Sequence, residues 1–163
     1  MNKKNLVILL QTILFAGVIF SWYTVYQDFG RFYAQEGTLF KIKDCVAPNP
    51  VTTPCFYGAF AFLGAFVWSL LIPKMAEEKR PLQYKYLSYL IIASVLFAWS
   101  NFTYILARFW LRPAGTAAIG CSGQLMTNPF TTPCFIGAAI FLVALGAVFL
   151  VRFADKPTPA KTV

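Results

Sequence analysis

The chain has 163 residues, of which 58% are hydrophobic, 12% are charged and none is His, and its formal net charge is +8. Ordinary soluble domains hold about 45–50% apolar and 25% charged residues, so this composition argues against a soluble domain and excludes a disordered chain. The absence of His excludes His-ligated haem, His-containing zinc sites and every catalytic triad built on His. A small integral membrane protein is the class that remains.

Four stretches without a charged residue are long enough to cross a hydrocarbon core of about 30 Å as helices. They run approximately from Leu6 to Gln27, Cys55 to Pro73, Tyr86 to Ala107 and Cys134 to Val151. Helices are the expected spanning structure because lipid offers backbone polar groups no partner. We therefore expect an all-α integral membrane protein, with one four-helix bundle over residues 1–154 and a flexible cytoplasmic tail over residues 155–163.

The distribution of basic residues predicts the orientation. With the N-terminus inside, the inner segments hold nine Lys and Arg residues and the two outer loops hold five. Cytoplasmic segments of membrane proteins carry the excess of basic residues, so both termini are predicted to be cytoplasmic, in a prokaryotic inner membrane. The charge lies at helix ends, which indicates a lipid bilayer rather than a nucleic acid as partner.

An internal repeat organises the chain. Residues 49–65 recur 79 residues later as residues 128–144, with 12 identities over 17 positions and a shared N-P-x-T-T-P-C-F-x-G-A segment. A weaker similarity at a spacing of 77 relates the first helix to the third; it matches Phe20 with Phe97, Trp22 with Trp99 and Arg31 with Arg108. The repeated unit is helix, outer loop, helix, over about 1–76 and 80–154. An even number of spans per unit predicts a parallel repeat with a pseudo-two-fold axis along the membrane normal.

The repeated segment also predicts local structure. Pro54 and Pro133 are expected to begin the second and fourth helices, because Pro at the first helical position loses no donor, with the preceding Thr as cap. Small residues let helices approach closely in lipid. We expect this packing role for Gly58, Gly64, Gly137 and Gly146, and contact with lipid or a partner for the Phe-rich helix faces.

All four cysteines fall on the predicted outer side, and an even number in an oxidising compartment predicts disulfides. Of the three connectivities, Cys45–Cys55 and Cys121–Cys134 are preferred because they close short loops in the same way in both copies. A disulfide that closes a loop of this length stabilises the folded protein by about 2–3 kcal/mol. Pairing across the repeats stays open if the second and fourth helices touch at their outer ends.

Four helices, cytoplasmic termini and two outer cysteine pairs are similar in plan to the quinone-linked disulfide-forming membrane oxidases and their vitamin K epoxide reductase relatives. The resemblance covers topology and cysteine number; it implies that Cys45, Cys55, Cys121 and Cys134 are catalytic and that a quinone is the cofactor. The C-x-x-C pair of that family is absent, since nine and twelve residues separate the cysteines here. A deep apolar pocket beside Cys55 or Cys134 would favour this alternative.

Two further sets of polar residues are candidates. Arg31 and Arg108 are each followed by two aromatic residues, which suits either binding of a lipid phosphate, a quinone headgroup or an acidic partner, or anchoring at the interface. Gln11 and Asn101 are expected within the membrane, where each is able to bond across helices. No acidic or basic residue lies in the four apolar stretches, which argues against an ion-coupled transporter.

The favoured hypothesis from sequence is therefore a non-catalytic, structural or accessory membrane protein. It would contact a membrane-protein partner, a second copy or a lipid-soluble ligand through its outer loops and Phe-rich faces, with no cofactor and no metal. The alternative is a membrane thiol–quinone oxidoreductase that uses the outer cysteine pairs. A third, less favoured hypothesis is a pore or carrier for a small neutral solute.

Overall fold

The computed structural model describes residues 2–41, 48–113, 116–120 and 124–154. These residues form four long helices and no β-strand. The helices are α1 (Lys3–Glu36), α2 (Pro54–Leu71), α3 (Arg80–Trp110) and α4 (Pro133–Ala154), with short 3-10 turns at Pro50–Thr52 (η1), Ile72–Lys74 (η2), Glu77–Lys79 (η3) and Pro129–Thr131 (η4). All four long helices are apolar and long enough to cross a membrane, as the composition predicted.

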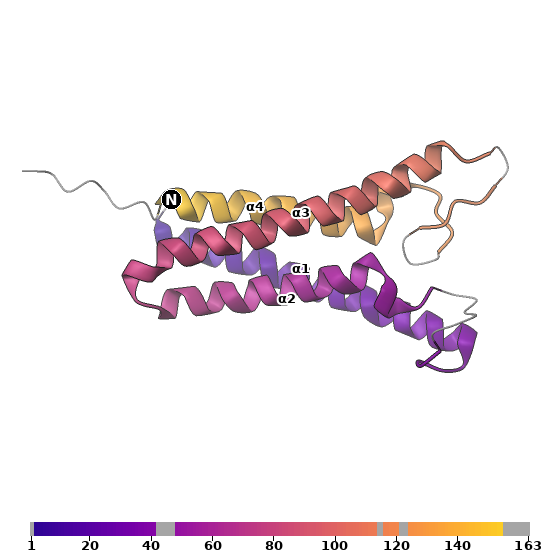
Figure 1. The fold of residues 1–163 in the computed structure, drawn as a ribbon, viewed down its shortest axis with the longest axis horizontal. Coiled ribbons are helices and arrows are strands. Elements are labelled where there is room, and N and C mark those ends of the chain that lie inside the picture. The colour runs from indigo at the N-terminus through magenta and orange to yellow at the C-terminus, as the bar shows by residue number, and fades with distance from the viewer. Residues whose placement is uncertain (1, 42–47, 114–115, 121–123, 155–163) are drawn as a thin grey trace, which may run out of the picture.

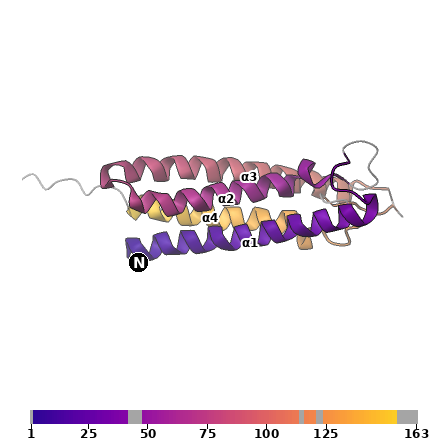
Figure 2. The ribbon, with the colours of Figure 1, turned by 90° about the horizontal axis from the view of Figure 1, so that it is seen from below.

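The helices lie side by side in an elongated bundle (Figures 1 and 2). The start of α1, the end of α4 and the turn between α2 and α3 share one end, here called the terminal end. The two long connections lie at the opposite end, here called the loop end (Figure 1). Helix α1 packs against α2 and α4, and α3 packs against α4 and less extensively against α2. Toward the loop end α1 and α3 diverge.

Helices α1 and α3 are longer than the apolar stretches that predicted them. They contain 34 and 31 residues, or about 51 and 47 Å at a rise of 1.5 Å per residue. Helix α1 continues past Gln27 to Glu36 and ends at Gly37, whose φ of 69° and N–H bond to Tyr33 O close the last turn. A charged residue ends an apolar run without ending a helix, so the apolar stretches did not predict where these two helices end.

Polar side chains link the helices in the terminal half of the bundle. Gln11 Nε2 donates to Ser69 O across α1 and α2 at 3.0 Å, which confirms a predicted bond between helices. Arg152 Nη1 donates to Ser88 Oγ across α4 and α3 at 2.9 Å. Asn101 differs from the expectation, because its Nδ2 donates to Phe97 O within its own helix at 2.7 Å.

The glycines of the repeated segment do not bring helices together. A Cβ built at any of them meets no heavy atom within 4 Å; they are Gly58, Gly64, Gly137 and Gly146. The close helix approach predicted at these glycines is therefore not found. Alanines occupy the fully buried positions of the same two helices; they are Ala59, Ala65, Ala138 and Ala144.

Close approach occurs instead at Gly17 of α1. A Cβ at this position would lie 2.4 Å from Cε1 of Phe62. The Phe62 ring in turn stacks face to face on Phe141 of α4, with ring centroids 3.7 Å apart and planes 5° apart. These three residues join α1, α2 and α4 at the middle of the bundle.

Candidate functional site: a cysteine pair beside an apolar cavity

The two copies of the repeated segment adopt the same local structure. Asn49 Oδ1 accepts from Val51 N at 3.0 Å, and Asn128 Oδ1 accepts from Phe130 N at 2.9 Å, so each Asn caps a 3-10 turn. A long helix then begins at the Pro of each copy. As a result, the cysteine of each copy is the second residue of its helix.

The predicted threonine cap is not found at Thr53. Its Oγ1 donates to Pro50 O at 2.7 Å, and it makes no side-chain bond to the first turn of α2. Thr132 donates to Pro129 O in the same way at 2.6 Å, and also accepts from Phe135 N at 3.5 Å. The hydroxyl prefers the nearby carbonyl because the preceding 3-10 turn presents that carbonyl directly to it.

The structure brings Cys55 and Cys134 together across the two repeats. Their Sγ atoms are 3.8 Å apart, and both residues are partly buried at the loop end of α2 and α4. The outer ends of the second and fourth helices therefore approach each other, which is the condition under which the sequence analysis kept pairing across the repeats as an alternative. Cys45 and Cys121 lie outside the described residues, so the pairs Cys45–Cys55 and Cys121–Cys134 stay predictions.

A half-enclosed cavity of about 50 Å³ adjoins the cysteine pair, and all four helices line it. Most lining residues form pairs related by the sequence repeat: Phe20 and Phe97, Ser21 and Ala98, Thr24 and Asn101, Pro54 and Pro133, Cys55 and Cys134, Gly58 and Gly137, and Phe62 and Phe141. Equivalent residues of the two units thus line the same cavity.

The polar side chains of this lining are already bonded within their own helices. Ser21 Oγ donates to Val18 O at 3.1 Å, and Thr24 Oγ1 donates to Phe20 O at 3.0 Å. The Asn101 amide also bonds within its own helix. What the lining offers to a ligand is therefore mainly aromatic and aliphatic surface, together with the two sulfur atoms.

One helical turn beyond Thr24, toward the loop end, lies a buried carboxylate. The Asp28 side chain is 3% exposed and forms an ion pair with Arg31 through Oδ1. Its Oδ2 is buried and has no hydrogen-bond partner among the described residues. The guanidinium of Arg31 only donates, so the Gln124 amide turns its oxygen toward Arg31 and accepts from it.

Sequence reasoning missed Asp28 because the apolar stretch ended one residue earlier. The sequence did contain a signal, namely residues at the helical spacings of three and four. These residues are Ser21, Thr24, Asp28 and Phe32, and all four are buried. Extending the periodicity of α1 beyond its apolar run would have placed Asp28 on the buried face.

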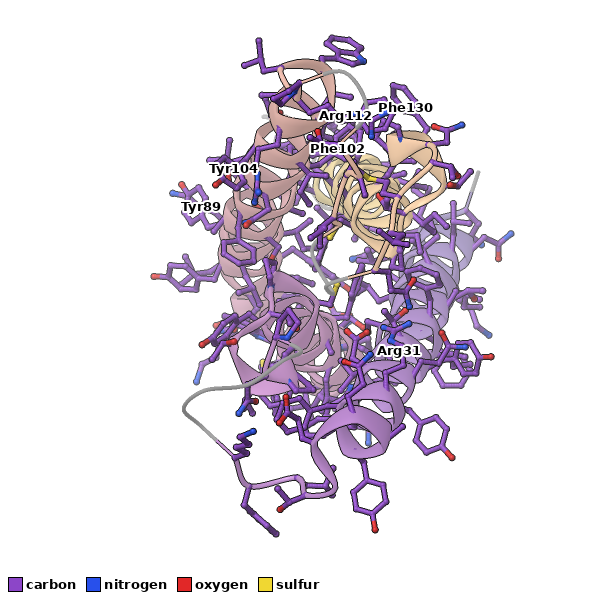
Figure 3. All side chains as sticks on the ribbon, turned by 90° about the vertical axis from the view of Figure 1, so that its right-hand side faces the viewer. Arg31, Tyr89, Phe102, Tyr104, Arg112 and Phe130 are labelled. Atoms are coloured by element: carbon purple, nitrogen blue, oxygen red, sulfur yellow. The ribbon has the colours of Figure 1, made fainter. Side chains whose placement is uncertain are left out.

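The repeat-equivalent arginines have different surroundings. Arg31 points toward the middle of the bundle end (Figure 3) and meets Asp28. Arg108 instead lies over the ring of Tyr104, with its Cζ 5.8 Å from the ring centroid, and Tyr104 points outward (Figure 3). The position equivalent to Asp28 is Ile105, which is buried against Ala118 and Met126.

Comparisons with known protein families, with curated proteins and with solved structures find no match for this chain. No cluster of three or more potential metal ligands occurs among the residues that the structure describes. The features with chemical potential among these residues are the cysteine pair, the cavity and the Asp28–Arg31 ion pair.

Proposed function

We propose that this chain is a membrane thiol–disulfide oxidoreductase in which Cys55 and Cys134 form the redox-active pair. The observation that carries the proposal is the 3.8 Å separation of their Sγ atoms beside an apolar cavity. A disulfide bond is about 2.05 Å long, so bond formation requires the two sulfur atoms to close by only about 2 Å. This geometry favours the redox alternative over the purely structural role that the sequence favoured.

The reaction transfers two electrons and two protons. Cys134 is in a disulfide in this structure; once exchange with the substrate dithiol has reduced it, the thiols of Cys55 and Cys134 lose both as their S–S bond forms, and a quinone takes both to become a quinol. A substrate dithiol then reduces the pair by thiol–disulfide exchange and leaves as a disulfide. The net reaction converts a dithiol and a quinone into a disulfide and a quinol. Cys45 and Cys121 are proposed to connect the pair to the surface by further exchange, each step forming one S–S bond as another breaks.

The cavity supports a lipid-soluble acceptor. Its lining is apolar and includes one aromatic ring from each of the four helices, and such rings are able to pack against a planar headgroup. The cavity is small, at about 50 Å³, and the headgroup is proposed to enter as a lining side chain swings aside. Phe97 is 41% exposed and is the lining ring best placed to do so.

The proposed orientation places the cysteines where disulfides persist. In the sequence, nine basic residues fall in the termini and the short connection between α2 and α3, and five fall in or beside the two long connections, which supports cytoplasmic termini and outer loops in a prokaryotic inner membrane. The outer side of such a membrane is oxidising. The matched residues around the cavity support a pseudo-two-fold axis that runs between Cys55 and Cys134.

The test is quinone reduction by the purified full chain in mild detergent. The probes are a short-chain benzoquinone and a reduced dithiol peptide, and the loss of quinone absorbance is followed. Cys55→Ser and Cys134→Ser are each expected to abolish turnover. The double variant C45S/C121S is the matched control: it should still oxidise its Cys55–Cys134 pair once when quinone is added.

Two outcomes would overturn the proposal. If the wild type shows no turnover while the serine variants unfold at lower temperature, the cysteines are structural and the non-catalytic role stands. If Cys55→Ser turns over at the wild-type rate, the reactive pair lies elsewhere. A pore or carrier draws no support from the geometry, because the stacked rings of Phe62 and Phe141 fill the middle of the bundle.

A further inference from the structure

A chain of hydrogen bonds joins α4 to α3 at the terminal end of the bundle. Arg152 Nη1 donates to Ser88 Oγ at 2.9 Å, and Ser88 Oγ in turn donates to Lys85 O at 2.7 Å. Ser88 is 0% exposed, whereas Arg152 is only half-buried. The guanidinium of Arg152 is thus fixed to α3 on one side and reaches the surface at the line where the two helices meet, here called the α3–α4 seam.

Arg152 keeps donors for a further partner. A guanidinium has five N–H groups and accepts no hydrogen bond, and Ser88 uses one of these groups. No carboxylate forms an ion pair with Arg152 in the part of the chain that the structure describes, and neither α3 nor α4 contains an acidic residue. The remaining donors suit an oxyanion, which a guanidinium binds through two parallel hydrogen bonds.

A second cation, Lys85, lies on the same side of the seam. Gln83 marks the face of α3 that meets α2, since its Oε1 accepts a hydrogen bond from that helix at 3.0 Å. At about 100° per residue, Ser88 lies about 140° around α3 from Gln83, and Lys85 lies about 60° further in the same direction. Lys85 is exposed, and its Nζ is 6.0 Å from the ring centroid of Tyr89, which points outward (Figure 3). Lys85 therefore flanks the Arg152–Ser88 contact from the outer surface.

The contact lies at the depth expected of a membrane surface. Helix α4 begins at Pro133, and Arg152 is about 29 Å further along its axis at 1.5 Å per residue, which matches a hydrocarbon core of about 30 Å. The residues that directly follow the two bonded partners are Tyr89 and Phe153, and they are 52% and 66% exposed. A ligand of Arg152 therefore meets exposed aromatic surface beside the cation. This combination suits a phosphate that carries acyl chains better than a free anion or an acidic protein segment.

The whole terminal end is electropositive. Among its described residues, seven side chains are basic and two are acidic, namely Glu77 and Glu78. Glu77 is already paired with Arg80. Such an excess of basic residues attracts anionic lipids, so their headgroups are enriched around the α3–α4 seam.

We propose that Arg152, held in place by Ser88 and assisted by Lys85, binds the phosphate of an anionic phospholipid at the terminal end of the α3–α4 seam. The unused N–H groups of Arg152 donate to the phosphate oxygens, and the Lys85 ammonium supplies the second positive charge. The acyl chains lie against the apolar outer surface of the two helices. This site is separate from the cysteine pair, which lies toward the opposite end of the bundle (Figure 1).

Native mass spectrometry of the purified full chain in mild detergent counts the lipids that stay bound. The probes are dioleoyl phosphatidylglycerol, dioleoyl phosphatidylcholine and inorganic phosphate. One phosphatidylglycerol molecule should be retained with an affinity about 50-fold above that of phosphatidylcholine, from about ten-fold for the paired donors of Arg152 and about five-fold for the charge of Lys85. An equimolar amount of inorganic phosphate should not displace it.

Substitutions separate a specific site from general attraction. Arg152→Gln is expected to weaken phosphatidylglycerol binding about ten-fold, and Lys85→Gln about five-fold. Arg80→Gln is the matched control, because it removes the same charge from the same end of α3. The Arg80 guanidinium is already bonded to Glu77 and to Met75 O, and it lies about 12 Å along the helix from Ser88, beyond the Debye length of about 8 Å. Its loss should therefore change binding less than two-fold.

Several results would overturn the proposal. Equal losses for Arg152→Gln and Arg80→Gln would show a general attraction of lipid to a positive surface. Equal retention of phosphatidylcholine would show that the anionic charge is not recognised, and displacement by inorganic phosphate would make a free anion the ligand. No retained phosphatidylglycerol would leave an acidic protein segment as the partner. If Arg152→Gln does not fold, Arg152→Lys replaces it; lysine keeps the charge without the paired donors, so an unchanged affinity would refute the site.

Discussion

The packing role of a glycine in this chain depends on which side chain of the neighbouring helix it contacts. Gly58 and Gly137 belong to the most conspicuous sequence motif, yet open space lies beside their backbone. Gly17 belongs to no motif, yet it faces the Phe62 ring at a distance that no Cβ tolerates. The position of a small residue can be read from the sequence, but the side chain that packs against it cannot. That contact depends on which helices pair and on how each is rotated about its axis.

Gly17→Ala is predicted to destabilise the protein by about 1–3 kcal/mol, the usual cost of overpacking. Phe62 cannot retreat easily, because its other face is stacked on Phe141. The measurement is thermal unfolding in detergent. The matched control is Gly30→Ala in the same helix, where no atom lies within 4 Å and the better helix propensity of Ala gives a gain of up to about 1 kcal/mol.

The Phe62→Leu background sharpens this test. Removing the ring should relieve most of the penalty of Gly17→Ala, which gives a coupling energy between the two positions. Equal unfolding temperatures for the Gly17 and Gly30 variants, or an undiminished penalty in the Leu background, would contradict the contact.

At the scale of elements, the starts of α2 and α4 were predictable and their caps only in part. Pro54 and Pro133 begin the two helices as expected. The predicted threonine cap is present at Thr132, which accepts from Phe135 N at 3.5 Å, and is missing at Thr53, while Asn49 and Asn128 cap the unpredicted 3-10 turns that precede the helices. Short 3-10 turns leave little trace in hydropathy; the structure reveals these two through their backbone bonds and the side-chain bonds of Asn49 and Asn128.

Asn49→Ala is predicted to cost about 1 kcal/mol, the typical loss of a cap. Its Oδ1 accepts from Val51 N, and its Nδ2 donates to Lys41 O at 3.0 Å, which ties η1 to the end of the preceding segment. Asn128→Ala should cost less, since the described residues show only the cap bond there. Hydrogen exchange of the amides of η1 and η4 measures both losses; a larger loss at Asn128 would refute the assignment.

The helices also account for part of the aromatic excess. Phe56 forms edge contacts with Phe29 and Phe60 in the first unit, at centroid distances of 6.4 and 5.0 Å. Phe102 packs against Phe130 and Phe135 in the second, at 5.8 and 5.1 Å, and Figure 3 shows Phe102 and Phe130 close together near the loop end. Many rings predicted to contact lipid or a partner therefore contact one another.

For the whole molecule, composition alone predicted four spans because lipid imposes helices on any long apolar run. The repeat indicated that equivalent residues would be related by symmetry. It did not indicate that Cys55 and Cys134 would meet, since loop length favoured local pairs and the approach of α2 and α4 depends on packing at Phe62 and Phe141. The departure from symmetry at Asp28 was likewise hidden, because an imperfect repeat gives no sign of which difference has chemical consequences.

The 3.8 Å separation of the Cys55 and Cys134 sulfur atoms predicts that a disulfide between them can join the two repeat units. Cleaving the chain between the units makes this disulfide detectable. The connection between α2 and α3 passes through an exposed stretch between η2 and η3, and a protease site inserted after Ala76 allows it to be cleaved there. In the C45S/C121S background the two halves then carry one cysteine each, Cys55 and Cys134. After oxidation by a benzoquinone the halves should migrate as one band on a denaturing gel without reductant and as two bands with it.

The matched control C45S/C121S/C134S must give two bands under both conditions. Two bands without reductant in the C45S/C121S protein would show that the 3.8 Å approach of the sulfur atoms does not lead to a bond, and the redox pair would be lost with it. A single band also fixes the relative placement of the units, because no disulfide joins Cys55 to Cys134 unless the loop ends of α2 and α4 meet. The same gel thus tests the chemistry and the packing of the bundle together.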